Sequence, residues 1–241
     1  MTEEFKLPEL YITPEHECSY LPDKHASTLF VNPQARKNNF LYSYLSSKGF
    51  RRSGEQLYMP YCTHCQACIP VRIRVMEFKP DRNQRRVLKK NSDLDISIEA
   101  VAFRDDEYEL YCRYLENRHT GSAMCNPSPE DYLSFLDSSW SNTRFHRFTL
   151  NDRLIAVAVV DYLNDALSAV YTFFDPEYSA RSPGKFAILH SVNIAGKLGL
   201  KWLYLGYWIE KCSKMNYKNR FQGIEYYYRQ GWTSRAPGTK E

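Results

Sequence analysis

Features that would place this protein in a membrane or outside the cell are missing from its sequence. The apolar stretch LIAVAVVDYL is interrupted at Asp161 and is too short to span a bilayer. The opening residues, MTEEFKLPEL, lack the basic region and apolar run of a secretory signal. No internal repeat or low-complexity segment is visible. The sequence therefore predicts a globular protein with no membrane partner.

A disulfide framework and a strong charge imbalance are also missing. The 241 residues include seven cysteines, and an odd number argues against the paired framework of a secreted protein. The net charge is only +4, so any contact with nucleic acid must come from a local basic patch. Hydrophobic residues make up 43% of the chain, which is enough for one large or two smaller packed domains. We expect a cytoplasmic protein.

The first part of the chain, residues 1–100, predicts mixed and loop-rich structure. Residues 69–78, IPVRIRVMEF, alternate apolar side chains with Arg72 and Arg74. This alternation predicts a half-buried strand with a basic outer face. Residues 92–100 alternate in the same way and predict a second strand.

The segment that joins these two strands, KPDRNQRRVLKKN, is strongly basic. Asp81 is its only acidic residue, and its six cations are Lys79, Arg82, Arg85, Arg86, Lys89 and Lys90. A solvated basic helix is one interpretation. A phosphate-binding surface is the other, because so many like charges repel one another unless an anion is near.

Residues 101–241 predict two helices, an antiparallel meander of three strands, a central helix and a returning strand. The central helix is expected to be capped by Ser182, with Pro183 just inside it. This order matches the acetyltransferase-like fold, in which the start of the central helix holds an acyl carrier. Free backbone amides there, with Gly184 and Lys185 beside them, would bind an anion. A simple helix cap is the alternative.

The predicted fold class is therefore α+β. We expect an acetyltransferase-like mixed sheet flanked by helices, with a smaller N-terminal α/β part. The predicted boundary lies at about residue 100. Residues 1–100 then carry the clustered cysteines and the basic segment, and residues 101–241 carry the catalytic fold.

Six blocks of the sequence resemble one known family. The blocks are ECSYLPDKHASTLF, GFRRSGEQLYMPYCTHCQACIPVRI, RNQRRVLKKN, ENRHTG, LSAVYTFFDPEYSARSPGKFAILHSV and LYLGYWIEKCSKMNYKNRF. Together they are spread over most of the chain, from residue 17 to residue 221. The family that they resemble is the bacterial aspartate/glutamate leucyltransferases, relatives of the arginyl-tRNA–protein transferases. After the last block this family usually continues with a proline and an acidic residue, whereas this chain continues with QGIEYYYRQGW.

The resemblance implies an aminoacyl transfer. Leucine would pass from Leu-tRNA to the α-amine of a protein that begins with Asp or Glu, which marks that protein for degradation by the N-end rule pathway. The donor ester is already activated, so the enzyme mainly has to align a neutral amine with the carbonyl. No covalent intermediate and no cofactor is required. The preference for leucine or arginine depends on pocket volume and stays open at this point.

The strand end before the central helix is the expected place of the chemistry. We expect Asp175 to hold or deprotonate the acceptor amine. Tyr171 is expected to donate a hydrogen bond to the carbonyl oxygen or to the departing ribose hydroxyl. His119 is the alternative base. The other interpretation of Asp175 is that it only begins the DPEY turn, where Asp before Pro is common.

Two further groups of residues are assigned to binding. The acidic first residue of the acceptor needs a cation, which the segment after the last predicted strand supplies. The candidates for this contact are Lys214, Tyr217, Lys218 and Arg220. The candidates for binding tRNA and phosphate are Ser182, Gly184, Lys185, Arg82, Arg85 and Arg86.

Three cysteines follow one another at a strict three-residue step: Cys62, Cys65 and Cys68. This spacing lets two thiolates bind one ion, and Cys18 could complete a site for zinc or an iron–sulfur cluster, with His64 as a spare ligand. The other interpretation is that reduced thiols pack beneath the basic strand. The remaining cysteines predict buried apolar side chains, and they are Cys112, Cys125 and Cys212.

Two other functions stay open at this point. A zinc-stabilised RNA-binding module without catalysis would fit the cysteines and the basic segment, and tightly bound zinc without aminoacyl transfer would favour it. An acetyl-CoA-dependent N-acetyltransferase would fit the fold, and release of free CoA from acetyl-CoA would favour it.

Overall fold

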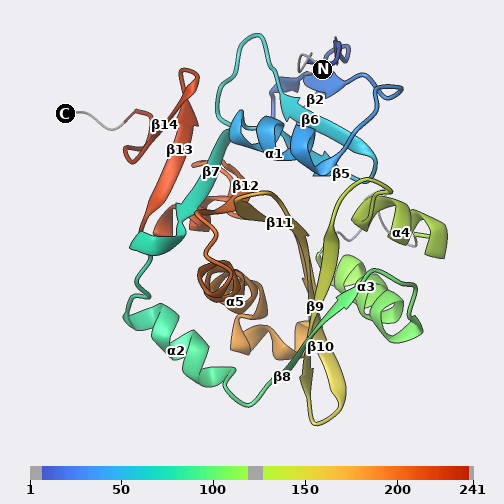
Figure 1. Cartoon of the computed structure of the whole chain (residues 1–241), viewed down its shortest axis with the longest axis vertical. Coiled ribbons are helices and arrows are strands. Elements are labelled where there is room, and N and C mark those ends of the chain that lie inside the picture. The colour runs from blue at the N-terminus through green and yellow to red at the C-terminus, as the bar shows by residue number, and fades with distance from the viewer. Residues whose placement is uncertain (1–6, 119–126, 239–241) are drawn as a thin grey trace, which may run out of the picture.

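One large mixed sheet organises the fold, with eight strands in the order β14-β13-β7-β12-β11-β10-β9-β8 (Figure 1). The computed structural model describes residues 7–118 and 127–238. The strands are β7 (Ile69–Arg74), β8 (Asp95–Ala100), β9 (Thr143–Leu150), β10 (Arg153–Tyr162), β11 (Ala166–Phe174), β12 (Trp202–Trp208), β13 (Ile224–Tyr228) and β14 (Gly231–Thr233). Neighbouring strands are antiparallel except β11 and β12, which are parallel.

A smaller N-terminal layer packs against the large sheet. It contains a four-stranded sheet in the order β1-β4-β6-β5, the strand pair β2-β3 and one helix. These elements are β1 (Leu10–Ile12), β2 (His16–Glu17), β3 (His25–Ala26), β4 (Thr28–Val31), α1 (Asn39–Ser47), β5 (Arg51–Ser53) and β6 (Gln56–Pro60). Buried side chains of the layer, such as Tyr42 and Leu57, share a core with Ala166 and Tyr204 of the large sheet.

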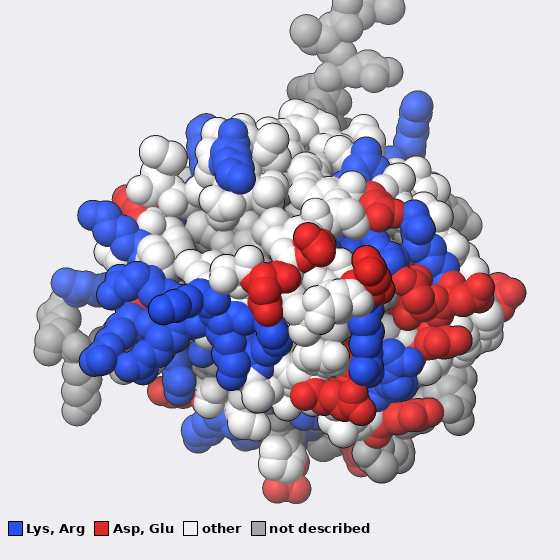
Figure 2. Space-filling model, turned by 90° about the horizontal axis from the view of Figure 1, so that it is seen from below, with Lys and Arg blue, Asp and Glu red and all other residues white. Residues whose placement is uncertain are grey.

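Helices cover both faces of the large sheet. The α-helices are α2 (Arg82–Lys90), α3 (Asp105–Arg118), α4 (Pro129–Leu136) and α5 (Pro183–Lys197), and the short 3₁₀ helices are η1 (Val75–Glu77), η2 (Pro176–Arg181) and η3 (Asn216–Arg220). α5 packs on one face with α2 beside it, and α3 and α4 pack on the other face (Figure 1). Figure 2 shows Lys and Arg side chains gathered in a broad patch on the side of α2. No helix in the described ranges is long and apolar enough to cross a membrane.

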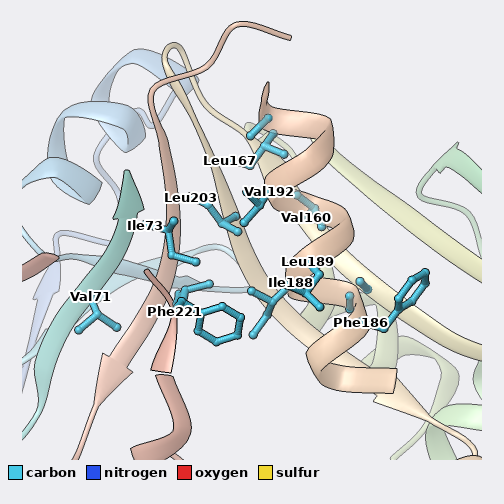
Figure 3. Packing of buried hydrophobic residues seen from close by; sticks show 14 of the residues in the cluster. Val71, Ile73, Val160, Leu167, Phe186, Ile188, Leu189, Val192, Leu203 and Phe221 are labelled. Atoms are coloured by element: carbon cyan, nitrogen blue, oxygen red, sulfur yellow. The ribbon is translucent and has the colours of Figure 1, made fainter. Parts of the chain in front are cut away.

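The main core forms between α5 and the large sheet. In Figure 3, Phe186 and Leu189 of α5 face strand side chains that include Val160 of β10. Because successive residues of a strand point to opposite faces, Val157 and Val159 of the same strand pack instead under α3 and α4. A fully buried aliphatic side chain contributes about 1.5 to 3 kcal/mol, so β10 fixes helices on both faces.

The predicted order of elements in the second part is confirmed. α3 and α4 are followed by the meander of β9, β10 and β11, then by α5 and β12. α4 begins as expected at Ser128, whose hydroxyl accepts a hydrogen bond from the backbone N–H of Asp131 at 3.1 Å. The predicted α+β class, a mixed sheet flanked by helices, is also confirmed.

Three details of the prediction are wrong. Arg72 does not lie on an exposed outer face, because its guanidinium is buried 3.5 Å from the ring centre of Trp202 and its Nε donates to Glu225 at 2.8 Å. Ser182 makes no capping hydrogen bond with its side chain, and its backbone is left-handed, with φ of 56°. The returning strand β12 is not the last one, since β13 and β14 follow it.

The large sheet takes strands from both predicted parts of the chain. β7 and β8 precede residue 100, yet β7 lies between β12 and β13, and β8 pairs with β9. The boundary at about residue 100 stays a prediction, and it does not separate one sheet from another.

A buried ion pair joins the N-terminal layer to the large sheet. Arg52 of β5 donates through Nε and Nη2 to the two carboxylate oxygens of Asp161 on β10, both at 2.7 Å. The same carboxylate accepts hydrogen bonds from Tyr42 Oη and Thr143 Oγ1, each at 2.8 Å. Neither charged side chain is exposed to solvent, so each charge depends on the other.

Acid is expected to destabilise the fold through two buried histidines. The rings of His146 and His190 lie 5.2 Å apart, and burial is the main cause that lowers the pKa of His146 to about 3 and that of His190 to about 4. The unfolded rings take up protons below about pH 6.5 and the folded rings do not, so this stability is present above that pH and is lost as the pH falls.

Urea unfolding tests this expectation. Between pH 7 and pH 5 the free energy of unfolding should fall by roughly 4 kcal/mol through these two groups. The double variant His146→Leu/His190→Leu should lose less stability over the same interval. An equal loss of stability in both proteins would show that the two histidines do not cause the sensitivity to acid.

Candidate active site

The large sheet opens between its two parallel strands. β11 and β12 pair only over Ala166–Ser168 and Trp202–Tyr204, which are the first residues of each strand. β11 then continues to Phe174 and β12 to Trp208 without further pairing between them. Backbone groups beyond the paired residues face the opening, which we call the β11–β12 junction.

Arg51 of β5 fills the closed end of this junction. Its Nη2 donates to the backbone oxygens of Ala169 at 2.7 Å and Val170 at 3.5 Å, and its Nη1 donates to Ser168 Oγ at 3.3 Å. On the β12 side a Cβ atom at Gly206 would lie 3.1 Å from the guanidinium carbon, so the close approach requires glycine there. Arg51 thus satisfies backbone oxygens of β11 that have no partner on β12.

Lys218 of η3 lies at the β12 side of the junction. Its Nζ donates to the backbone oxygen of Tyr207 at 2.8 Å and lies 3.3 Å from Met215 Sδ. The side chain is buried, and burial, followed by the charge of Arg51, lowers its pKa to about 7. The Cys212 thiol acts in the opposite direction.

An aromatic wall stands where β11 leaves the junction. Tyr171 packs edge-on against Tyr114 of α3 and Phe135 of α4, with ring centres 6.2 and 5.3 Å apart. Burial raises the pKa of the Tyr171 hydroxyl well above its usual value, and Arg118 opposes this rise. Tyr171 therefore stays protonated at neutral pH and can act as a hydrogen-bond donor.

The basic helix α2 lies beside the start of α5. Lys90 Nζ donates to the backbone oxygen of Ala180 at 2.7 Å, and Asn91 Nδ2 donates to that of Arg181 at 3.0 Å. At the other end of α2, Gln84 Nε2 donates to the backbone oxygen of Arg220 at 3.1 Å. α2 thus bridges η3 and the start of α5. The predicted phosphate-binding residues on it are exposed, and they are Arg82, Arg85 and Arg86.

The predicted residues at the start of α5 lie next to this basic surface. Gly184 and Lys185 are half-buried in its first turn, and a Cβ atom at Gly184 would lie 3.8 Å from the ring of Phe174 at the end of β11. The C-terminal end of α2 therefore lies beside the start of α5, while Arg82, Arg85 and Arg86 lie toward the end of α2 that contacts η3. Whether they bind tRNA stays a prediction.

The clustered cysteines line a cavity of about 800 Å³ on the N-terminal layer. Cys18, Cys62, Cys65 and Cys68 are all half-buried free thiols. Burial, followed by the neighbouring thiols, raises the pKa of Cys68 to about 12, so this thiol is protonated at neutral pH. Within the described ranges, no three His, Cys, Asp or Glu side chains are placed to hold a metal ion, so the thiols do not form a ready ligand set.

Known proteins share this sequence over most of its length. The family model described as "Arginine-tRNA-protein transferase, C terminus" matches residues 106–228, and the one described as "Arginine-tRNA-protein transferase, N terminus" matches residues 16–86. An aspartate/glutamate leucyltransferase of Marinobacter nauticus is 50% identical over 215 residues, which cover 89% of this chain and 91% of that protein. The chain belongs to the aspartate/glutamate leucyltransferase family.

The family predicted from the sequence blocks is thereby confirmed, and so is the enzyme class, an aminoacyltransferase. Another aspartate/glutamate leucyltransferase, from Alcanivorax borkumensis, is 49% identical over 224 residues, which cover 93% of each chain. Among solved structures, the ribosomal-protein-S18-alanine N-acetyltransferase from Escherichia coli is similar at 16% identity with a TM-score of 0.33, over 45% of this chain and 64% of that one.

In this member of the leucyltransferase family, Asp175 is buried and already has partners. Its Oδ2 lies 2.8 Å from Nη2 of Arg153 and 3.8 Å from Nη2 of Arg113. Its Oδ1 accepts a hydrogen bond from the backbone N–H of Glu177 at 3.0 Å, so the side chain caps η2. Its role as a base stays a prediction. His119, the alternative base, lies outside the described residues.

We expect Asp175→Asn to lower the rate of transfer by about tenfold or more, because it removes a negative charge and keeps the shape. Affinity for charged tRNA should not change. Single-turnover transfer and tRNA binding measure the two effects, and Glu177→Gln is the matched control because it changes the other carboxylate on Arg153. A wild-type rate in Asp175→Asn, with His119→Ala inactive, would assign the base to His119.

The predicted acceptor residues occupy different environments. Lys214 and Arg220 are exposed, Tyr217 is half-buried, and Lys218 is buried at the junction. Sequence reasoning missed Arg51 altogether. The sequence offers one signal for Arg51, which is that Arg52 follows it. Successive side chains of a strand point to opposite faces, so only one of these two arginines could pair with Asp161.

Proposed function

We propose that this protein transfers leucine from Leu-tRNA to the α-amine of proteins that begin with Asp or Glu, and so marks them for degradation. The names of its relatives support this donor and acceptor, and the matching family models name tRNA. The observation that carries the proposal is that α2 bridges η3 and the start of α5. An anionic donor can therefore lie along α2 with its ester at the junction, where cations are available to an acidic acceptor.

The reaction requires little from the protein beyond alignment. The neutral α-amine attacks the ester carbonyl, an amide bond forms, and the ester C–O bond breaks to release the ribose hydroxyl, which takes the proton that the amine loses. The α-amine has a pKa near about 8, so a weak base suffices. Tyr171, protonated and at the strand end, is suited to donate to the oxyanion or the departing oxygen.

The test is transfer of labelled leucine or arginine from charged tRNA to peptides that differ only in their first residue. We expect transfer of leucine to Asp- and Glu-initiated peptides and weak transfer to an Ala-initiated peptide. Equal use of all three peptides, or no transfer of either amino acid, would refute the proposal. Release of CoA from acetyl-CoA in the same assay would favour the N-acetyltransferase instead.

The proposal includes a location and a cofactor status. Charged tRNA is an intracellular substrate and the six described cysteines are free thiols, which supports a cytoplasmic location. The reaction as written uses no cofactor. Zinc or an iron–sulfur cluster at the four clustered cysteines stays a prediction, and elemental analysis of the protein purified without oxygen tests it.

A further inference from the structure

We propose that Arg51 and Lys218 together form the subsite that holds the acidic side chain of the acceptor's first residue. This inference rests on the proposed function and deepens it. It adds Arg51, from the N-terminal layer, to the acceptor site and selects Lys218 from the four predicted acceptor residues. This subsite lies at the closed end of the β11–β12 junction.

Arg51 and Lys218 lack the counter-charge that the buried arginines have. Each of the three buried arginines faces a carboxylate: Arg52 pairs with Asp161, Arg72 with Glu225 and Arg147 with Glu107. Lys218 is also buried, and within the described residues its Nζ has two polar contacts, a backbone oxygen and a sulfur atom. Arg51 contacts two backbone oxygens and a hydroxyl. No acidic side chain in the described part of the chain balances either cation.

Lys218 is buried and Arg51 is half-buried. Two cations without a counter-charge at one place are costly, because loss of water disfavours each charge and the charges repel each other. The effect of this repulsion is felt at Lys218, whose pKa is lowered by burial and also by the charge of Arg51. A carboxylate between them would remove both costs. The pair therefore favours a ligand with one negative charge that can enter the junction.

Arg51 and Lys218 can each donate further hydrogen bonds. A guanidinium has five N–H donors and an ammonium has three. The contacts of Arg51 use two of its nitrogens and those of Lys218 include one backbone oxygen, so donors remain on both side chains. Hydrogen bonds from charged donors to a carboxylate are about twice as strong as neutral ones. The subsite can thus hold an Asp or Glu side chain directly.

Burial explains why this pair, and not Lys214 or Arg220, should decide the choice of acceptor. The latter two side chains are exposed, where water and salt weaken a single ion pair to about 1 kcal/mol or less. At a buried site, an acceptor without the charge leaves both cations unpaired. Discrimination between Glu and its neutral isostere Gln can then reach about a hundredfold or more.

The same geometry makes the discrimination depend on pH. The groups that face Lys218 are the Arg51 guanidinium from β5, the Tyr207 carbonyl from β12, and the Cys212 thiol and Met215 sulfur from the following loop. With a lowered pKa in the empty site, Lys218 loses its charge as the pH rises above neutrality, and it must regain a proton to bind the carboxylate. The preference for Glu over Gln should therefore fall about fivefold between pH 7 and pH 8. The α-amine titrates in both peptides, so its effect cancels in the ratio.

The experiment compares kcat/KM for Glu- and Gln-initiated peptides across matched variants. Arg51→Gln and Lys218→Gln each remove a charge and keep an N–H donor for the backbone oxygens. As a control, Lys211→Gln removes an exposed cation from the loop that joins β12 to η3. We expect each of the first two variants to lower the Glu/Gln ratio at least tenfold, mainly through the Glu peptide, and to remove or flatten its pH dependence. The control should keep the wild-type ratio.

Each outcome has a distinct meaning. If the wild-type protein does not use Glu-initiated peptides, the proposed function fails, whatever the variants do. If it does, but Arg51→Gln and Lys218→Gln keep the wild-type ratio, the subsite is refuted. Equal losses on Glu and Gln peptides would also refute it, because they would assign the cations to the reaction intermediate. If Arg51→Gln fails to fold, Lys218→Gln and the charge-preserving Arg51→Lys decide the matter, and Arg51→Lys should retain most of the ratio.

Discussion

Replacing Asp161 with asparagine is expected to destabilise the protein by about 3 to 5 kcal/mol. The substitution keeps the shape of the side chain and leaves the buried guanidinium of Arg52 without a counter-charge. The hydrogen bonds from Tyr42 and Thr143 to the same carboxylate would be weakened as well. Urea unfolding at pH 7 measures the effect as a shift in the free energy of unfolding.

The matched control removes both charges. In Arg52→Met/Asp161→Leu no buried charge is left unpaired, so this double variant should be more stable than Asp161→Asn, although it carries two substitutions. A loss below about 1 kcal/mol in Asp161→Asn would mean that water reaches the pair, contrary to its burial.

Reversing two charges on α2, with Arg85→Glu and Arg86→Glu, is expected to lower affinity for charged tRNA about a hundredfold at low salt. Both side chains are exposed on α2, the helix that bridges η3 and the start of α5. Loss of two phosphate contacts should also reduce the salt dependence of binding, by roughly 1 to 2 in the slope of log K against log salt. Binding at a series of salt concentrations measures both effects.

A control with the same change in net charge separates this surface from general attraction. Lys24 precedes β3 and Arg36 lies between β4 and α1, and both are exposed. In Figure 1 the N-terminal layer and α2 lie at opposite ends of the molecule. Lys24→Glu/Arg36→Glu should keep most of the affinity and the wild-type salt slope. Equal losses in the two double variants would show that α2 acts only through net charge.

The sequence predicts elements well where one face of a helix or strand is buried and the other is exposed. The start of α4 at Ser128 and the order of the meander follow from local signals, and both are confirmed. The same rule was wrong for Arg72. Alternation indicates which residues share a face, but it cannot tell water from a second layer of protein, and here Trp202 and Trp232 cover the face with the arginine.

The junction could not be predicted for a related reason. The place of Arg51 depends on two strands that stop pairing after three residues, which no local pattern encodes. β13 and β14 have five and three residues, too few for a clear alternation, and they form because β7 offers a free edge. Contacts between distant segments determine all of these features.

The position of β7 has a consequence for how the chain can be made. β7 (Ile69–Arg74) leaves the ribosome well before both of its neighbours, β12 and β13, are synthesised. Until then its two backbone edges have no partners, and unpaired edges invite pairing with other chains. The large sheet therefore closes through contacts of high sequence separation, which makes folding slow and delays its final step until β12 and β13 have been synthesised. Fragments divided at residue 100 should each be unable to fold alone and should recover activity only when mixed.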